Sequence, residues 1–244
     1  MIRGRAFPEL FLGLLAHALA AVWIAHLFTA TIHDAKHAHD TITITGSAKK
    51  PIAADLVQWH LSVEGKAPTP VAAARRAHAA ATALAAFLRA AGIDRGSISA
   101  QVVQSDVEVT RIDKKHTRTT YAVRQGFDVS TRRIDVVERA ATRLGTLLER
   151  GVDVAAEPLA YVSTNLEAAK LDALTAATAE ARRRAGIIVA GLGGKLGGMR
   201  ASSLGVYQIT PRNSTEVSDY GVNDTSSRLK DVTAVVSATF AVRE

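Results

Sequence analysis

The chain has 244 residues, of which 48% are hydrophobic and 22% charged, a balance that excludes intrinsically disordered and collagen-like proteins and allows a sizeable core. It contains no cysteine, which excludes disulfides, thiol catalysis and cysteine-ligated zinc or iron–sulfur sites. The net charge of +7 lies in residues 41–244, because acidic and basic residues balance over residues 1–40. This basic part of the chain is expected to favour anionic partners.

An uncharged apolar segment runs from Leu10 to Ile32. It is long enough to span about 30 Å of hydrocarbon and lacks a good small-x-small cleavage site, which favours a transmembrane anchor over a cleaved signal peptide. Arg3 and Arg5 precede it, so the positive-inside rule places the N-terminus in the cytoplasm. We therefore expect residues 1–40 to form a cytoplasmic stub, a single-pass inner-membrane anchor over residues 10–32 and a juxtamembrane linker. The domain of residues 41–244 would then lie in the periplasm or outside the cell.

The expected linker is rich in histidine. His33, His37 and His39 alternate with aspartates and could bind a divalent metal, because imidazole and carboxylate are common metal ligands. A solvated linker has the same composition, and the sequence leaves both interpretations open.

Alternating apolar residues open the domain. The pattern predicts a short strand over Thr41–Thr45, turn residues over Gly46–Ala54 and a second strand over Leu56–Val63, which together would form a hairpin. The side chains expected on one face of the second strand are Val57, Trp59 and Leu61.

A helix follows this hairpin. Thr69 is placed to cap it and Pro70 to begin it, and Gly92 is placed to end it. Its apolar residues at helical spacing are Ala77, Ala81, Leu84, Ala85 and Leu88.

The same order of elements then recurs. The periodicity predicts a strand from Ile98 to about Val109 and a partner strand over Tyr121–Val129, joined by a basic turn over residues 111–119. Asp135 and Glu138 have the spacing of a capping pair for a helix that ends near Arg150.

A third portion completes the domain. A strand over Leu159–Ser163 precedes a long helix that begins with a capping-box pattern at Thr164 and ends near Gly191, and at least two of Arg182, Arg183 and Arg184 should be solvated. Strands over Met199–Tyr207 and Val232–Val242 finish the chain, separated by a polar segment expected to be a long exposed loop or disordered. The predicted fold is α+β: strand-strand-helix repeats that pack helices on antiparallel sheet, preceded by one transmembrane helix.

Several motifs succeed one another in a characteristic order. The sharpest is Ala181-Arg182-x-x-Ala185 on a helix, leading to the turn Leu192-Gly-Gly-Lys-Leu-Gly197. The others are Ile44-Thr45-Gly46, Ala90-Ala91-Gly92-Ile93 before Ile98, Tyr121 at the start of a strand, and Leu147-Leu148 before Gly151. Together they resemble the SIMPL-domain family, also called DUF541, over nearly all of residues 41–242. The chain departs from that pattern at Ala48 and at Ala54-Asp55, where the family often has Gly-x-Gly and Pro-Asp.

The resemblance implies an exported α+β domain that assembles, in at least some members, into ring-like or channel-like homo-oligomers. It implies no catalytic residue, and it links bacterial relatives to oxidative-stress tolerance. Since one fold serves many functions, it does not define this chain's role.

Motifs for catalysis or cofactor binding are missing from the sequence. The glycines around Lys195 match neither the dinucleotide nor the phosphate-loop pattern and suit a helix C-terminal turn. His60, His78 and His116 stand without a nucleophile elbow, and His60 and His78 are expected to be structural or surface groups. We therefore assign no catalytic, cofactor-binding or metal-binding residue and expect no cofactor.

The basic turn is the one surface cluster with a candidate role. It contains Arg111, Lys114, Lys115 and Arg118, which could contact anionic lipid, an acidic partner or a neighbouring subunit. The scarcity of aromatic residues among the cations disfavours nucleic acid as a partner.

Three functions follow from these patterns. The leading hypothesis is a non-enzymatic, membrane-anchored and exported scaffold that forms a homo-oligomer in the cell envelope. The second is a binding module for an anionic ligand or envelope polymer. The third is a metal-assisted hydrolase, which would need a carboxylate and a histidine that converge in a pocket.

Overall fold

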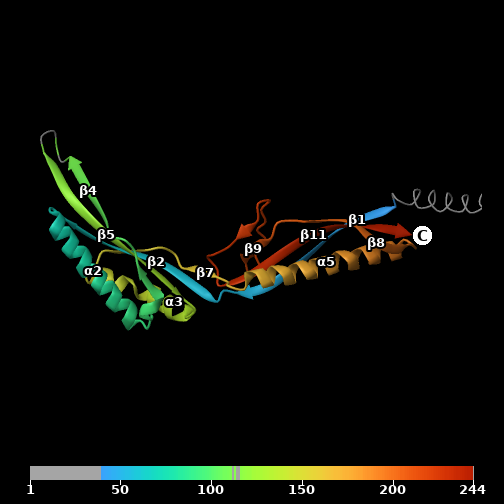
Figure 1. Ribbon diagram of the computed structural model, residues 1–244, viewed down its shortest axis with the longest axis horizontal. Coiled ribbons are helices and arrows are strands. Elements are labelled where there is room, and N and C mark those ends of the chain that lie inside the picture. The colour runs from blue at the N-terminus through green and yellow to red at the C-terminus, as the bar shows by residue number, and fades with distance from the viewer. Residues whose placement is uncertain (1–39, 112, 114–115, 244) are drawn as a thin grey trace, which may run out of the picture. The chain divides into compact units, whose positions relative to one another are not determined.

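The computed structural model describes residues 40–111, 113 and 116–243 (Figure 1). The predicted anchor and the histidines at positions 33, 37 and 39 lie outside the described residues. Within the described ranges, no helix is both long and apolar enough to cross a membrane. The described chain divides into two compact units. Unit 1 comprises the residues up to Ala48 with 174–205 and those from Ala234 onward, and unit 2 comprises 49–173 and 206–233.

Unit 2 is built on an antiparallel sheet whose two central strands are long. These are β2 (Leu56–Ala67) and β5 (Thr117–Thr131), which pair along eleven positions from Val57 opposite Thr131 to Ala67 opposite Tyr121. Short strands flank them: β3 (Ile98–Ala100) and β4 (Gln104–Arg111) pair with β5, and β6 (Val154–Ala156) and β7 (Ala160–Val162) pair with β2.

Helices cover one face of this sheet. They are α2 (Pro70–Ala90), α3 (Ile134–Arg143) and α4 (Gly145–Glu149), and Figure 1 shows α2 and α3 lying along β2 and β5. As predicted, Val57, Trp59 and Leu61 share the buried face, where they join Leu84 and Leu88 of α2 in one core. The predicted α2 boundaries are also confirmed: Thr69 Oγ1 accepts a hydrogen bond from the Ala72 amide, and Gly92 adopts a φ of +89° that ends the helix.

Two short strands interrupt the polar segment between the last two predicted strands, which corrects its interpretation as one long loop, whereas residues 212–221 and 224–228 form loops as predicted. β9 (Gln208–Pro211) pairs antiparallel with the start of β11 (Leu229–Arg243), and β10 (Val222–Asn223) pairs parallel with β9. The ammonium of Lys230, which is only 3% exposed, donates to the carbonyl oxygens of Tyr161 and Asp224. Hydrogen bonds to a buried charge, rather than apolar periodicity, therefore hold the segment in place.

Unit 1 consists of strands that contact one long helix. Its strands come from β1 (Thr41–Ala53), from β11 and from β8 (Lys195–Leu204), and its helix from α5 (Leu166–Gly191). β11 lies between β1 and β8 and pairs antiparallel with β8 from Val236 opposite Leu204 onward. The core is small: Ala181 and Ala185 of α5 pack on Ala238 and Phe240 of β11. The mixture of sheets and helices in the two units is an α+β fold, as predicted.

The predicted hairpin over residues 41–63 is wrong. β1 continues through Gly46 to Ala53 and joins β11, whereas β2 belongs to the other sheet. Gly46 marks a close approach instead of a turn, because a Cβ there would lie 2.3 Å from the Ala177 carbonyl oxygen and 2.5 Å from the Ala181 amide nitrogen. Glycine lets the backbone of β1 contact the backbone of α5.

Two predicted capping interactions are also replaced by other contacts. Asp135 and Glu138 do not cap α3, whose N-cap residue is Arg133; both bind the guanidinium of Arg228, at 2.6 and 3.5 Å. Thr164 lies before α5 and donates its hydroxyl to Asp55. In both places a partner distant in the sequence takes the polar group that local spacing had assigned to a cap.

Candidate functional site

The hairpin of β4 and β5 carries the predicted basic cluster. β4 extends to Arg111 and β5 begins at Thr117, so the connection is shorter than the predicted turn. Asp113 and His116 are bonded across it, with the His116 amide donating to the Asp113 carboxylate over 2.8 Å. Lys114 and Lys115 lie outside the described residues.

Arg111 and Arg118 are exposed but do not form one patch. Arg111 pairs with Thr117, and Arg118 pairs with Thr110. Since neighbouring residues of a strand point to opposite faces, the two arginines lie on opposite faces of the hairpin. A flat anionic surface can therefore meet both only if the hairpin approaches it end-on.

Replacing Lys114, Lys115 and Arg118 together by serine is expected to weaken binding of the full chain to anionic vesicles. Each basic residue near such a surface contributes about 1 kcal/mol, and salt screens the contribution. Vesicle co-sedimentation at low and physiological salt measures the effect, with Arg75→Ser on the exposed side of α2 as the control. Equal binding of the triple variant and the control at low salt would leave the tip without a role in membrane contact.

Ion pairs occupy one face of the same hairpin. Lys66 of β2 lies 3.1 Å from the carboxylate of Glu108 on β4 and 3.5 Å from that of Glu64. Glu64 also binds Arg124 of β5, at 2.9 Å. The charges on this face therefore compensate one another within the unit.

The opposite face of the hairpin carries Val107, Val109 and Val123 and is partly uncovered. Val107 pairs with Tyr121, and Val123 of β5 points the same way and is buried against Ala73 and Ala77 of α2. Val107 and Val109 remain 56% and 64% exposed, and every residue of β4 is exposed. Among the strands of the described ranges, only β5 pairs with β4, and it lies on one side. The hairpin thus presents an open strand edge beside exposed valines. The sequence did not predict this edge, because alternation alone does not say which face of a strand a helix covers.

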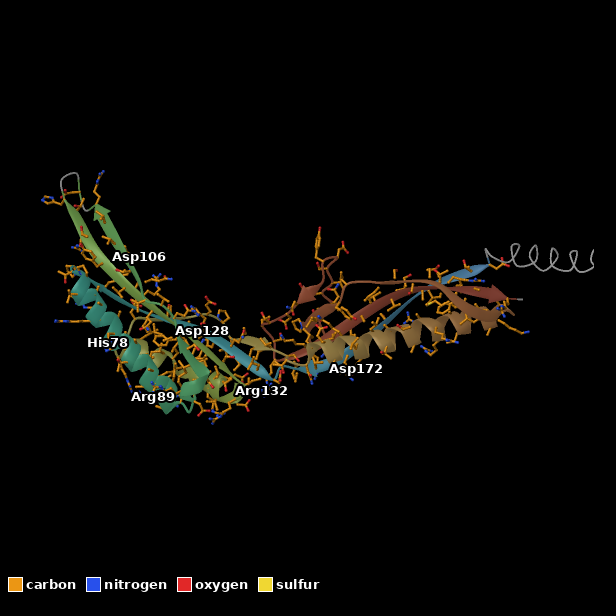
Figure 2. The ribbon with its side chains drawn as sticks, viewed as in Figure 1. His78, Arg89, Asp106, Asp128, Arg132 and Asp172 are labelled. Carbon is orange, nitrogen blue, oxygen red and sulfur yellow. The ribbon has the colours of Figure 1, made fainter. Side chains whose placement is uncertain are left out.

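A polar network crosses the face of the unit 2 sheet opposite its helices. The His60 imidazole Nδ1 and the Asp128 carboxylate are joined by a hydrogen bond of 2.8 Å, and the Gln101 amide donates to the same carboxylate over 2.7 Å. Both bonds hold the pKa of Asp128 below its ordinary value, and the bond with His60 has the larger effect. Gly126 leaves space beneath the His60 ring, since a Cβ there would lie 3.3 Å from its Cε1. Figure 2 labels Asp128 in its place on β5.

His60 and Asp128 line a cavity of about 390 Å³ together with Ser130. A carboxylate and a histidine do converge here, as the hydrolase hypothesis requires. Among the described residues, however, no hydroxyl group is bonded to the imidazole, and no three histidine or acidic side chains are grouped as metal ligands. The network connects β2, β5 and the residue after β3, and such cross-strand bonds also suit a purely structural role.

Asp55 connects three distant parts of unit 2. Its carboxylate accepts hydrogen bonds from the Thr164 hydroxyl and, over 2.6 Å, from the Thr164 amide, and it binds Arg132 at 2.8 Å. The bonds from Thr164 hold the pKa of Asp55 below its ordinary value, with the charge of Arg132 adding to the effect. The aspartate at the Ala54-Asp55 motif thus fixes the start of β2 against the segment before α5.

The matched family model is described as "SIMPL: Protein of unknown function (DUF541)", and it covers residues 42–240. The chain belongs to the SIMPL family. The family prediction is therefore confirmed, and the matched range includes residues of both units. Among curated proteins, no relative matches the chain.

Proposed function

We propose that this SIMPL protein is a non-enzymatic scaffold that is exported, anchored in the inner membrane through residues 10–32, and assembled with copies of itself in the cell envelope. The observation that carries the proposal is the open edge of β4 beside the exposed Val107 and Val109. An exposed, apolar edge strand is a template for pairing with another chain.

The two faces of the β4–β5 hairpin differ in chemistry: one carries ion pairs and the other carries exposed valines. Ion pairs among Lys66, Glu108, Glu64 and Arg124 compensate the charges of one face within the chain. On the other face α2 covers Val123, but no described residue buries Val107 or Val109, and apolar area of this kind favours contact with another protein surface. A strand added along β4 would satisfy its free backbone groups and shield the valines at the same time.

A second copy is the simplest partner for this edge. Each copy presents the same strand with the same valine spacing, so self-association needs no further component. The proposed anchor would confine the copies to one plane and raise their effective concentration without adding an interface. Assembly would then require neither a bound ligand nor a catalytic step.

Replacing both Val107 and Val109 by lysine is expected to break the assembly. Charged side chains on an edge strand oppose strand addition, and each buried valine contributes about 1.5 kcal/mol or more to a contact. Light scattering of the detergent-extracted full chain should give a multiple of 25.8 kDa for the unmodified protein and a single chain for the variant. Val217→Lys, at a still more exposed valine away from β4, should leave the mass unchanged.

A single chain at all concentrations up to about 100 μM, a bound of about 5 kcal/mol on the association free energy, would contradict assembly. Loss of assembly in the Val217→Lys control would instead remove β4 as its site. N-terminal sequencing of the same membrane preparation tests the anchor separately. A mature chain that begins after Ala30 would contradict a retained anchor and leave the assembly proposal standing.

A further inference from the structure

A groove runs along unit 1 between α5 and β8. It follows from the composition of α5, whose buried positions in this unit are Ala177, Ala181 and Ala185, followed by Val189 near the end of the helix. Small side chains and Gly46 bring the helix close to β1. Of β8, Leu196 packs against the core that α5 forms with β11, whereas Met199 and Leu204 remain exposed.

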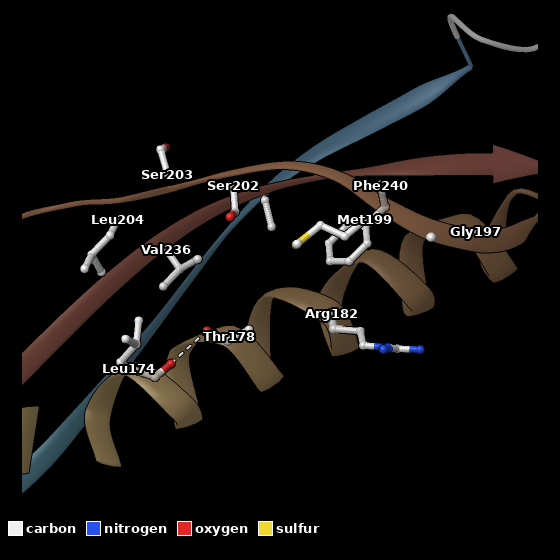
Figure 3. A pocket seen from close by; sticks show the side chains of 12 residues that line it. Leu174, Thr178, Arg182, Gly197, Met199, Ser202, Ser203, Leu204, Val236 and Phe240 are labelled. Atoms are coloured by element: carbon white, nitrogen blue, oxygen red, sulfur yellow. Dashed lines mark hydrogen bonds between the residues drawn. The ribbon is translucent and has the colours of Figure 1, made fainter. Parts of the chain in front are cut away.

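Apolar side chains line this groove. The register of β8 with β11 places Leu204 beside Val236, Ser202 beside Ala238, and Met199 beside Phe240, on the sheet face that meets α5. Figure 3 shows these side chains directed toward α5. Met199 and Leu204 are 60% and 51% exposed although they share a face with buried residues of β11. The groove encloses about 530 Å³.

The groove has few polar groups, and they differ in whether they already have hydrogen-bond partners. The Thr178 hydroxyl is occupied, because it donates to the Leu174 carbonyl oxygen over 2.9 Å. Arg183 and Arg184 both bind Glu180, at 2.8 and 2.7 Å, and lower its pKa to about 2. Arg182 lines the groove and, among the described residues, has no hydrogen-bond or ion-pair partner.

We propose that the groove binds a single-chain fatty carboxylate. Its alkyl chain lies along Met199, Ser202 and Leu204, between β8 and α5, and its carboxylate binds the guanidinium of Arg182. The alkyl chain covers the exposed apolar side chains, which favours binding by removing apolar area from water. The carboxylate supplies the acceptor that Arg182 lacks, and arginine and carboxylate have complementary geometry.

The size and charge of the groove favour this ligand over others. A volume of about 530 Å³ lies within the range of small-molecule sites. One unpaired guanidinium matches one carboxylate, whereas an uncharged alcohol would leave it without a partner. The apolar residues 10–32 carry no acidic side chain that would pair with Arg182, and a contact with a second copy of the chain is an outcome of the test below.

Photolabelling of the full chain tests the proposal. The probe is a laurate analogue that carries a diazirine on its alkyl chain, applied to the chain held in an amphipathic polymer, and the labelled positions are read by mass spectrometry. Saturable labelling within residues 174–182, 197–204 and 236–240 is expected, and unlabelled laurate should compete for it. Ser202→Phe, at an exposed position on the groove face, should abolish the labelling.

Arg182→Gln distinguishes a carboxylate site from a general apolar surface. The variant should raise the laurate concentration needed for half-competition by about tenfold, since hydrogen bonds to charged groups are among the strongest. Competition by lauryl alcohol should be unchanged. Arg183→Gln removes the same charge from the same helix and should leave competition by laurate unchanged, because Arg183 is paired with Glu180. Thermal unfolding checks that all variants are folded.

Three outcomes would overturn the proposal. One is labelling that does not saturate or that lies elsewhere in the chain. Another is equal competition by laurate in Arg182→Gln and the unmodified chain. The third is a change of assembly mass in Ser202→Phe with labelling intact, which would make the groove a contact between copies. Loss of assembly in the β4 variants has no bearing on it, so the two proposals fail independently.

Discussion

Replacing Gly46 by valine is expected to lower the free energy of unfolding of unit 1 by about 3 kcal/mol. Overpacking a core costs about 1–3 kcal/mol when side chains can move. Here the added Cβ would meet main-chain atoms of Ala177 and Ala181 at 2.3 and 2.5 Å, so α5 itself must move away from β1. Valine favours strands, so strand propensity does not contribute to the loss.

Gly198→Val is the matched control for this substitution. Gly198 lies on β8 of the same unit, and a Cβ there would meet no atom within 4 Å. Urea unfolding followed by circular dichroism measures the stability, and hydrogen exchange at the amides of β1 and α5 locates the change. Equal stability of the two variants would contradict the close helix–strand contact.

Replacing Lys230 by methionine is expected to destabilise unit 2 by about 3 kcal/mol. Methionine keeps the length of the side chain but leaves the carbonyl oxygens of Tyr161 and Asp224 without their donor. Breaking a buried charged interaction costs about 3–5 kcal/mol. Burial lowers the pKa of Lys230, and the charge of Asp224 acts in the opposite direction.

Lys50→Met makes the same chemical change at an exposed site of unit 2. Lys50 binds Asp172 at 3.0 Å with both side chains about half exposed, and such pairs contribute at most about 1 kcal/mol. The difference between the two variants in urea unfolding isolates the effect of burial. Increased proteolysis around β9 and β10 in Lys230→Met would show that the ammonium holds this segment. A loss no larger than that of Lys50→Met would contradict this role.

The groove and the open hairpin edge share one physical origin. In each, a sheet is wider or longer than the helix that covers it. α5 leaves the β8 face uncovered in unit 1, and α2 buries Val123 but not Val107 in unit 2. Both candidate sites are therefore places where apolar area remains after folding, and neither resembles a catalytic centre.

The family, the α+β class and several local features could be predicted from the amino-acid sequence. Thr69, Pro70 and Gly92 defined α2 because caps, proline and glycine act through neighbouring backbone groups. Alternation identified the buried face of β2. Arg182, Arg183 and Arg184 are exposed, as expected because three consecutive helix residues cannot all face one buried partner. Such features depend on residues a few positions apart, which a single sequence contains.

The pairing of the strands and the faces that stay exposed depend on contacts between distant segments and could not be predicted from the sequence. Gly46 resembled a turn residue until α5, far away in the sequence, was found against it, and Asp135 resembled a cap until Arg228 reached it. The basic turn resembled one patch until the register separated Arg111 from Arg118. Each of these outcomes depends on contacts between distant segments, whose free energies exceed those of the local signals and do not appear in local spacing.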